Sequence, residues 1–313
     1  MNNHLFKRAD FNDLTETSGI ELIKDLITQS RPNEWVSDYP NTQDLHELLA
    51  LEEVKGQTIV WLDDIGEAKA FCIIDIYNNL LFDCVDFSNY TPIFKEAVQF
   101  GTGIIKKKYH EEQIVPTLDA CCRKDDYLRV DSLTKEGFER EAYESISFKR
   151  ALLEISTPIT LPPGFIIRPL NGEHELNAYV DLHQKAFGTS QMTQDFRRSI
   201  MSAPEYDPQL DLVVQSPEGI LVAFCVCQIN ESENIAGKEK FGWTDPIGVH
   251  PDFRKLGLAK ALLIEGFLRL KARGLDYARL GTRSDNLAMI HLAEAMGFLE
   301  ASRKLWFSRE ICC

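Results

Sequence analysis

No run of apolar residues in this sequence approaches the length of a membrane span, and the first residues, MNNHLFKRADFNDL, contain no apolar stretch typical of a secretory signal. Basic residues are also scarce, because 34 Lys and Arg stand against 48 Asp and Glu, for a net charge of −14. Proteins that bind a nucleic-acid backbone collect Lys and Arg. We therefore expect a cytoplasmic protein that binds neither nucleic acid nor membrane, with a charge compatible with a cationic or amine substrate.

Several well-known ligand motifs are missing as well. No G-x-x-x-x-G-K-S/T occurs, which argues against a P-loop, and the only near match to G-x-G-x-x-G, GTGIIK from Gly101, ends in Lys106. No pair of cysteines shows the C-x-x-C spacing of zinc or redox sites, so we expect reduced, mostly buried thiols and no metal. The eight cysteines are Cys72, Cys84, Cys121, Cys122, Cys225, Cys227, Cys312 and Cys313.

The chain length and one linker predict two domains. The 313 residues, 44% of them apolar, suffice for two cores of about 150 residues each. The stretch ISTPITLPPGF, residues 155–165, has three prolines and a glycine and divides the chain near its middle. We predict a first domain over 1–155, a linker over 156–164 and a second domain over 165–313.

The second domain reads as a mixed α/β fold. FIIRPL, LDLVV, ILVAFCVCQI, FGWTDPIGV and DYARLGT have the composition of strands. HELNAYVDLHQKAF, GLAKALLIEGFLRLKARG and DNLAMIHLAEAMG show helical spacing of their apolar residues. The first domain supplies similar elements, QTIVWLDD, KAFCIIDIY and LLFDCVDF, followed by a helix near IFKEAVQFGTGIIKK. Each half is therefore expected to be mixed α/β around a sheet.

An internal repeat links the two halves. CCRKDDYLRVDSLTKEGF, residues 121–138, aligns without gaps on GTRSDNLAMIHLAEAMGF, residues 281–298. The offset of 160 residues is about half the chain, which favours a diverged duplication of one fold.

The turn between Val249 and Leu258 has the features of an anion site. HPDFRKLG leaves a strand and leads into a helix, whose first N–H groups are free and carry partial positive charge. Gly257 lets a bulky anion approach the backbone, and Arg254 and Lys255 add positive charge. A diphosphate fits this turn, and the first half has no counterpart of it.

At these residues the sequence resembles a known family. VHPDFRKLGLA is similar to the acetyl-CoA loop of the GNAT N-acetyltransferase superfamily, with the pattern R/Q-x-x-G-x-G/A met by Arg254, Gly257 and Ala259. LPPGFIIRPL, EYDPQLDLVV and DPIGVHPDFR further resemble tandem-domain members akin to mycothiol synthases. The resemblance covers the second half well and the first weakly. It implies a tandem GNAT fold, in which each half is a mixed, mostly antiparallel sheet flanked by helices and the first domain is degenerate and lacks a CoA motif.

The resemblance also implies the site residues. Backbone groups of Ile247 and Val249 would pair with the pantetheine arm of acetyl-CoA as an added strand would, and the Val249 N–H would polarise the thioester carbonyl. The turn would hold the diphosphate, and Asn286 would hydrogen-bond the cofactor. The implied cofactor-binding residues are Ile247, Gly248, Val249, Arg254, Lys255, Leu256, Gly257, Leu258, Ala259 and Asn286.

Asp245 is the candidate general base. An alkylammonium must lose a proton before it can attack a thioester, and Asp245 matches the acidic position of the family pattern. Asp245 lies two residues before Ile247 on the same expected strand, so its side chain should share a face with Ile247 and Val249. The alternative is an ordinary carboxylate at a strand end, and the sequence favours neither reading.

The sequence departs from the family where a tyrosine usually protonates the leaving thiolate. Ala293 takes that position, while His291 lies about 200° around the helix and is expected at the surface. Tyr206 is a possible substitute on a loop. Cys225 and Cys227 alternate in a strand and are expected in the core.

Two functions stay open at this stage. The first is an acetyl-CoA-dependent N-acetyltransferase that acts on a small amine by direct attack, and the second is a non-catalytic acyl-CoA sensor. The chain would act as a monomer or homodimer, and the acceptor cannot be read from the sequence.

Overall fold

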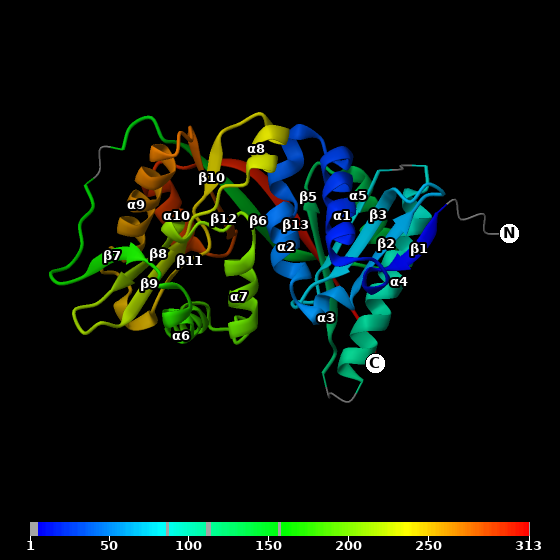
Figure 1. Cartoon of the computed structure of the whole chain (residues 1–313), viewed down its shortest axis with the longest axis horizontal. Helices are drawn as coiled ribbons and strands as arrows, with labels where there is room; N and C mark the ends of the chain where they lie inside the picture. The colour runs from blue at the N-terminus through cyan, green and yellow to red at the C-terminus, as the bar shows by residue number, and fades with distance from the viewer. Residues whose placement is uncertain (1–5, 86–87, 111–113, 156–157, 313) are drawn as a thin grey trace. The chain divides into compact units, whose positions relative to one another are not determined.

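The computed structural model describes residues 6–85, 88–110, 114–155 and 158–312 (Figure 1). Ser156 and Thr157 of the expected linker, and Cys313, lie outside the described residues. The seven cysteines described form no disulfide. No helix in the described ranges is long and apolar enough to cross a membrane.

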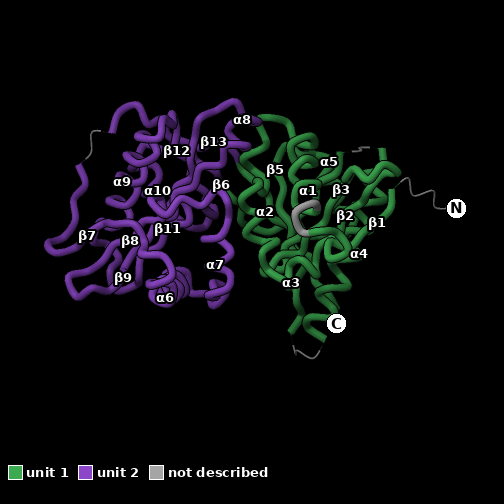
Figure 2. The backbone as a smooth tube through the Cα atoms, viewed as in Figure 1, with its two compact units in different colours: residues 1–145, 303–313 green, residues 146–302 purple. Residues whose placement is uncertain are grey.

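The chain divides into two compact units, which Figure 2 colours separately. Unit 1 comprises residues 1–145 and 303–313, and unit 2 comprises residues 146–302. Two strands, β6 (Glu139–Ala151) and β13 (Leu299–Glu310), begin in one unit and end in the other. The C-terminal residues therefore belong to unit 1, which differs from the linear division at 155 and 165. A linker rich in proline marks a loop but does not show where the following strand pairs.

Unit 1 contains an antiparallel sheet in the order β1 (Lys7–Asp10), β2 (Thr58–Leu62), β3 (Ala68–Ile74) and β4 (Leu80–Cys84). Its opposite faces contribute to two separate buried clusters, one with α4 (Tyr90–Tyr109) and one with α1 (Glu16–Ser30) and α2 (Thr42–Leu49). β5 (Thr117–Arg123) pairs antiparallel with β13 over Lys304–Glu310. The remaining helices are the 3-10 helices η1 (Phe11–Asp13) and η2 (Asn33–Asp38), with α3 (Glu52–Lys55) and α5 (Tyr127–Lys135).

The near match to a dinucleotide motif lies inside helix α4. A Cβ built on Gly101 would come within 2.9 Å of Ile74 Cδ1 and 3.0 Å of Leu118 Cδ2. The glycine therefore allows α4 to pack closely on its strands, which is a structural role rather than a phosphate site.

Unit 2 repeats this plan. Its antiparallel sheet has the order β11 (Ile247–Val249), β9 (Leu221–Val226), β8 (Asp211–Gln215) and β7 (Ile166–Pro169). One face packs against α6 (Leu176–Phe187) and the other against α9 (Leu258–Ala272). β10 (Phe241–Trp243) pairs in parallel with β12 (Tyr277–Arg283). The other helices are η3 (Gly172–Glu175), α7 (Gln194–Ser202), η4 (Pro208–Leu210), α8 (Glu231–Gly237), η5 (Pro251–Phe253) and α10 (Leu287–Ala295).

The repeat detected in the sequence has a structural counterpart. β5 and β12 begin 160 positions apart, and so do α5 and α10. Arg123 holds Asp125 through two hydrogen bonds of 2.8 and 2.7 Å, and Arg283 holds Asp285 through two of 3.1 and 2.7 Å. The same local geometry at both places is what a duplicated fold would leave, and the mixed α/β architecture with mostly antiparallel sheets is confirmed.

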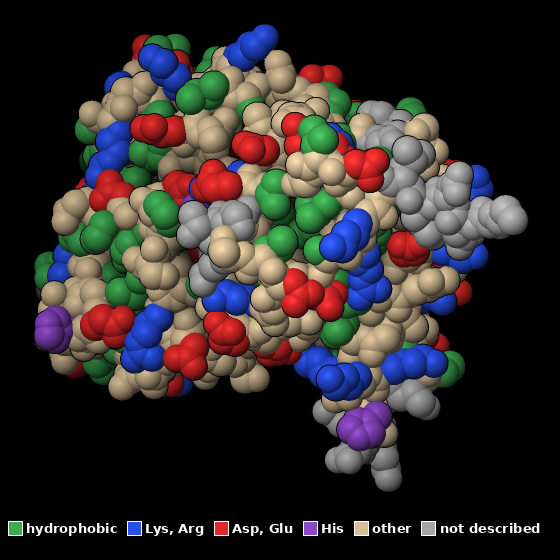
Figure 3. All heavy atoms as spheres, turned by 45° about the vertical axis from the view of Figure 1, so that its right-hand side comes forward, with side chains coloured by type: hydrophobic (Ala, Val, Ile, Leu, Met, Phe, Trp, Pro, Cys, Tyr) green, Lys and Arg blue, Asp and Glu red, His purple; other side chains and the backbone are tan. Residues whose placement is uncertain are grey.

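On the face shown in Figure 3, Asp and Glu side chains lie among Lys and Arg side chains. Such mixing is ordinary for a solvated surface.

Candidate functional site: a strand divergence followed by an uncapped helix

The sequence expected as one strand, FGWTDPIGV, is two strands in the structure. β10 follows β12 in parallel as far as Trp243, and the Thr244 N–H still donates to Arg279 O at 2.9 Å. β11 then pairs with β9 and forms the edge of a different sheet. Pro246, which follows a cis peptide bond, has no N–H with which to continue a ladder. The chain therefore diverges from β12 at residues 244–246.

Asp245 lies at this divergence. Its Oδ2 accepts a hydrogen bond of 2.9 Å from the N–H of Gly281 on β12. A Cβ built on Gly281 would lie 3.0 Å from the same oxygen, so the absence of a side chain there permits the approach. Because Asp245 precedes β11 instead of belonging to it, the alternation argument that placed it on the face of Ile247 and Val249 does not apply.

Among the residues that the structure describes, no strand pairs with one edge of β11. Pro246 O accepts from Val226 N at 3.0 Å, and His250 N donates to Val222 O at 2.9 Å. Backbone groups alternate in direction along a strand, so those of Ile247 and Val249 face away from β9. Such an edge can bond an extended chain that carries amides.

The turn after β11 is held by Arg254 and His250. Arg254 donates through Nη2 to Ala186 O at 3.0 Å and through Nε to Val249 O at 3.5 Å, which is a weak contact. His250 Nδ1 accepts from Asp252 N at 3.3 Å, so His250 serves as a turn residue. The guanidinium of Arg254 thus connects the end of α6 to the end of β11.

Helix α9 begins at Gly257 without a capping side chain. Gly257 has φ of 79°, and a Cβ built on it would meet nothing within 4 Å. Lys255, which is exposed, also has a positive φ, of 65°. The N–H groups of the first helical turn have no acceptor within the helix and attract anions. The uncapped start, the open glycine and the adjacent lysine are the features that a diphosphate requires, so these residues fit the implied acyl-CoA.

Asn286, the other residue implied to bind the cofactor, caps helix α10. Asn286 is exposed, and its Oδ1 accepts from Met289 N at 3.2 Å, so the amide nitrogen takes no part in the cap. Ala293 is completely buried and belongs to the core under α9, whereas His291 is exposed. The side chain at position 293 therefore packs the core and has no group that can donate a proton.

A buried polar cluster in unit 2 was not anticipated from the sequence. Arg197 and Asp211 are both completely buried and form an ion pair, and Tyr206 donates to Asp211 Oδ2 at 2.6 Å. Burial and the adjacent carboxylate raise the pKa of Tyr206, so its hydroxyl is unsuited to protonate a thiolate. Burial, together with Arg197, lowers the pKa of His183 to about 4. The one sequence feature that could have indicated this cluster is Asp211, a charged residue at the start of the apolar run DLVV.

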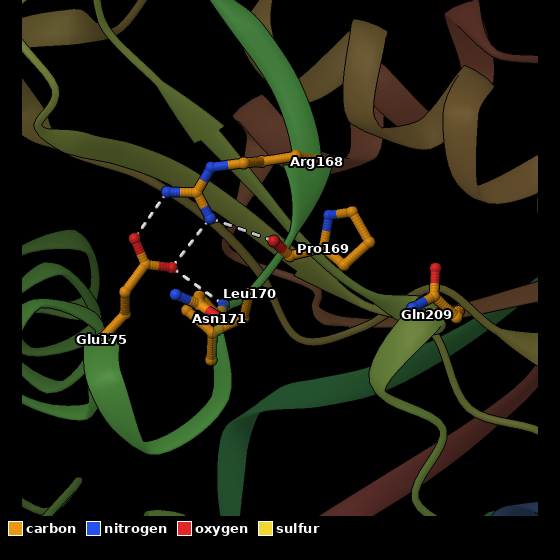
Figure 4. Close-up of a pocket in the computed structure, with 6 residues that line it drawn as sticks. All are labelled: Arg168, Pro169, Leu170, Asn171, Glu175 and Gln209. Carbon is orange, nitrogen blue, oxygen red and sulfur yellow. Dashed lines mark hydrogen bonds and ion pairs between the residues drawn. The ribbon is translucent and has the colours of Figure 1, made fainter.

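A hollow of about 500 Å³ lies elsewhere in unit 2, and Figure 4 draws the residues that line it. Arg168 and Glu175 form a bidentate ion pair of 2.5 and 2.8 Å beside it. Both charges are therefore matched, and none of the candidate site residues lines this hollow, whose lining is Arg168, Pro169, Leu170, Asn171, Glu175 and Gln209.

Comparison with known proteins identifies the part of the chain that holds these features. Residues 176–298 match the Acetyltransferase (GNAT) family, and this range includes Asp245, the turn after β11 and Asn286. Residues 176–298 are a GNAT acetyltransferase domain. The sequence resemblance to that superfamily is confirmed.

The chain is also similar to curated proteins named mycothiol acetyltransferase. A mycothiol acetyltransferase of Kineococcus radiotolerans is 30% identical over 161 residues, which is 50% of each chain. One from Arthrobacter is 25% identical over 238 residues, or 68% of this chain and 71% of the relative. The chain spans about half the length of the first curated relatives that it matches.

Solved structures match the whole chain and show the tandem GNAT fold. A GCN5-related N-acetyltransferase from Sphaerobacter thermophilus has a TM-score of 0.70 at 19% identity and covers 100% of this chain and 98% of its own. A tandem GNAT protein from the clavulanic acid biosynthesis pathway has a TM-score of 0.65 at 12% identity, covering 98% of each chain.

Proposed function

We propose that the chain is an acetyl-CoA-dependent N-acetyltransferase whose chemistry is confined to unit 2. One observation carries the proposal: the unpartnered edge of β11 leads within eight residues, 250–257, to the uncapped start of α9. A strand edge that bonds amides and a helix start that binds phosphate thus follow one another along the chain. In coenzyme A, the amide-bearing pantetheine arm is likewise followed directly by the diphosphate.

The backbone performs most of the binding in this proposal. Ile247, Gly248 and Val249 form the strand edge, and the Val249 N–H stabilises negative charge on the thioester oxygen. The turn Arg254, Lys255, Leu256, Gly257, Leu258 and Ala259 holds the diphosphate. Acetyl-CoA supplies an activated acyl group, and Asn286 contributes a side-chain amide. These assignments follow the family pattern and the local geometry.

Asp245 is proposed as the general base. Its Oδ2 is fixed by the N–H of Gly281, immediately before the strand edge. A carboxylate held in this way accepts a proton from an ammonium directly or through water. The same contact anchors the chain where it leaves β12, so Asp245 also positions β11.

The leaving thiolate requires no acid in this scheme. Ala293 has no proton to donate, and the hydroxyl of Tyr206 is committed to Asp211. A thiol with a pKa near 8.5 is already a fair leaving group, so transfer proceeds without a dedicated donor.

The proposed acceptor is a small-molecule amine. The curated relatives named mycothiol acetyltransferase support a small molecule, and the net charge of −14 favours a cationic one. Incubation with acetyl-CoA and a panel of amines, amino acids and aminoglycosides, while free thiol is followed, tests the proposal. We expect amine-dependent thiol release, and no release above the uncatalysed rate with any amine would refute catalysis.

A second candidate is favoured by the alanine at position 293. A non-catalytic acyl-CoA sensor needs the binding residues but no proton donor. Calorimetric binding of CoA without thiol release would support the sensor, whereas binding with release supports the transferase.

A further inference from the structure

Unit 1 contains the same strand divergence that unit 2 uses. Asn79 forms a parallel bridge with Asp119, and Asp119 N donates to Asn78 O at 3.1 Å. β4 then pairs with β3 in another sheet, as β11 pairs with β9. Since β5 corresponds to β12, the place between the diverging strands β4 and β5 is the counterpart of the proposed pantetheine position in unit 2.

Tyr39 occupies this place in unit 1. Its hydroxyl accepts a hydrogen bond of 3.1 Å from Arg123 N on β5 and donates one of 2.8 Å to Asp126 Oδ2. The residue is 7% exposed and belongs to the same buried cluster as Phe82 and Cys84 of β4. The hydroxyl of Tyr39 therefore bonds the end of β5, and its side chain is buried in the same core cluster as side chains of β4.

The two arginines that pair with Asp83 also lie close to the ring of Tyr39. Asp83 on β4 accepts from Arg31 at 3.0 and 2.6 Å and from Arg129 at 2.7 Å. Arg31 also donates to Pro40 O at 2.5 Å, next to Tyr39, and the two guanidiniums lie 5.5 and 4.5 Å from the ring centre. Burial would raise the pKa of Asp83, but the two arginines hold it below its usual value.

The helix start in unit 1 also differs from that in unit 2. Only five residues, 85–89, separate β4 from α4, against eight, 250–257, between β11 and α9. The shorter connection contains no glycine, lysine or arginine. It therefore lacks the residue types that make the turn of unit 2 suited to a diphosphate.

We infer that unit 1 binds no acyl-CoA, because residues 31–40 occupy its strand divergence, and that each chain binds one acyl-CoA, in unit 2. The inference rests on the proposed function for the site of unit 2. It follows from three features of unit 1: the buried tyrosine, the paired charges of Asp83, Arg31 and Arg129 beside it, and the shorter connection between β4 and α4. Displacing residues 31–40 would remove Arg31 from Asp83 and leave this buried carboxylate with Arg129 as its remaining ion-pair partner, and losing one partner of a buried charge is strongly destabilising.

Isothermal titration of the full chain with coenzyme A tests the number of sites. We expect one CoA per chain, and about 100-fold weaker binding in Gly257→Asp, which sets a carboxylate beside the diphosphate. Gly274→Asp is the matched control. Gly274 also has φ of 79° with nothing within 4 Å of a built Cβ, but it follows the C-terminal end of α9. This variant should bind CoA as the unmodified chain does.

The outcomes separate the inference from the function on which it rests. Two CoA per chain, with one site of unchanged affinity left in Gly257→Asp, overturns the inference alone. One CoA per chain that Gly257→Asp binds with unchanged affinity contradicts the proposed site in unit 2 as well. No binding to the unmodified chain contradicts the proposed function and the count together. Hydrogen exchange of the unmodified chain gives a second readout that requires no variant. CoA should protect backbone amides in residues 247–260, and protection of amides in residues 31–40 or 79–84 overturns the inference.

Discussion

The contact between Asp245 and Gly281 allows the chemical role of Asp245 to be separated from its structural role. In Asp245→Asn, the amide oxygen can still accept from the Gly281 N–H. A hydrogen bond to a charged acceptor contributes about 1 kcal/mol more than one to a neutral acceptor, so the free energy of unfolding should fall by roughly that amount. CoA binding should stay within about threefold, which corresponds to less than 1 kcal/mol.

Transfer should respond quite differently in Asp245→Asn. An amide cannot accept the proton of the amine, and general-base catalysis contributes about 10²- to 10⁴-fold. We therefore expect thiol release at saturating acetyl-CoA to fall by about this factor. The measurements are urea unfolding, calorimetric CoA binding and initial rates of thiol release on the same preparation.

Asp245→Ala is the comparison variant. It leaves the Gly281 N–H without its acceptor, which costs about 1–3 kcal/mol if the group stays buried. β11 also loses its anchor to β12, so CoA binding should weaken together with stability. Transfer at the unmodified rate in Asp245→Asn would refute the base assignment, and equal stability of the two variants would refute the anchoring role.

Three further predictions concern the interior of unit 2. Burial lowers the pKa of His183 from 6.5 to about 4, so the folded state keeps the ring neutral and the free energy of unfolding should fall as pH falls from 6.5 towards 4. In His183→Phe, the free energy of unfolding measured in urea should depend less on pH over that range. An unchanged pH dependence contradicts this. Arg197→Met leaves Asp211 buried without a counter-charge and should lower the free energy of unfolding in urea by about 3–5 kcal/mol. Adding Asp211→Leu should recover most of this loss. Equal stabilities of the single and double variants contradict this. Ala293→Tyr overpacks a core position and should cost about 1–3 kcal/mol without faster thiol release, whereas a faster rate in a fully stable variant would show that position 293 reaches the site.

Local signals allowed much of the fold to be predicted from the sequence. Helix α9 was expected from its apolar spacing and the glycine before it, and its N-terminal cap residue is Gly257. The repeat was visible because Arg123 and Asp125 match Arg283 and Asp285, and because Gly137 matches Gly297. In the structure both glycines follow equivalent helices and have φ near 80°. Caps and turns depend on neighbouring residues, so a single sequence reveals them.

The remaining features depend on contacts between distant residues. Asp245 bonds Gly281, 36 positions away, and this contact accompanies the break in a strand that looked continuous. Tyr39 bonds the N–H of Arg123, 84 positions away, and its ion-paired neighbours are equally scattered. No periodicity or motif encodes such pairs. The sequence also did not predict that β6 and β13 run from one unit into the other, because strand pairing depends on the whole fold.

The central claim is that the turn after β11 in unit 2 holds acetyl-CoA for transfer to an amine. The most direct test compares initial rates of amine-dependent thiol release from acetyl-CoA for the unmodified chain, Gly257→Asp and the control Gly274→Asp. We predict release by the unmodified chain and the control, and at least a tenfold loss in Gly257→Asp at subsaturating acetyl-CoA, about 1.4 kcal/mol or more. Equal rates in all three proteins, or no amine-dependent release in any, would contradict the claim.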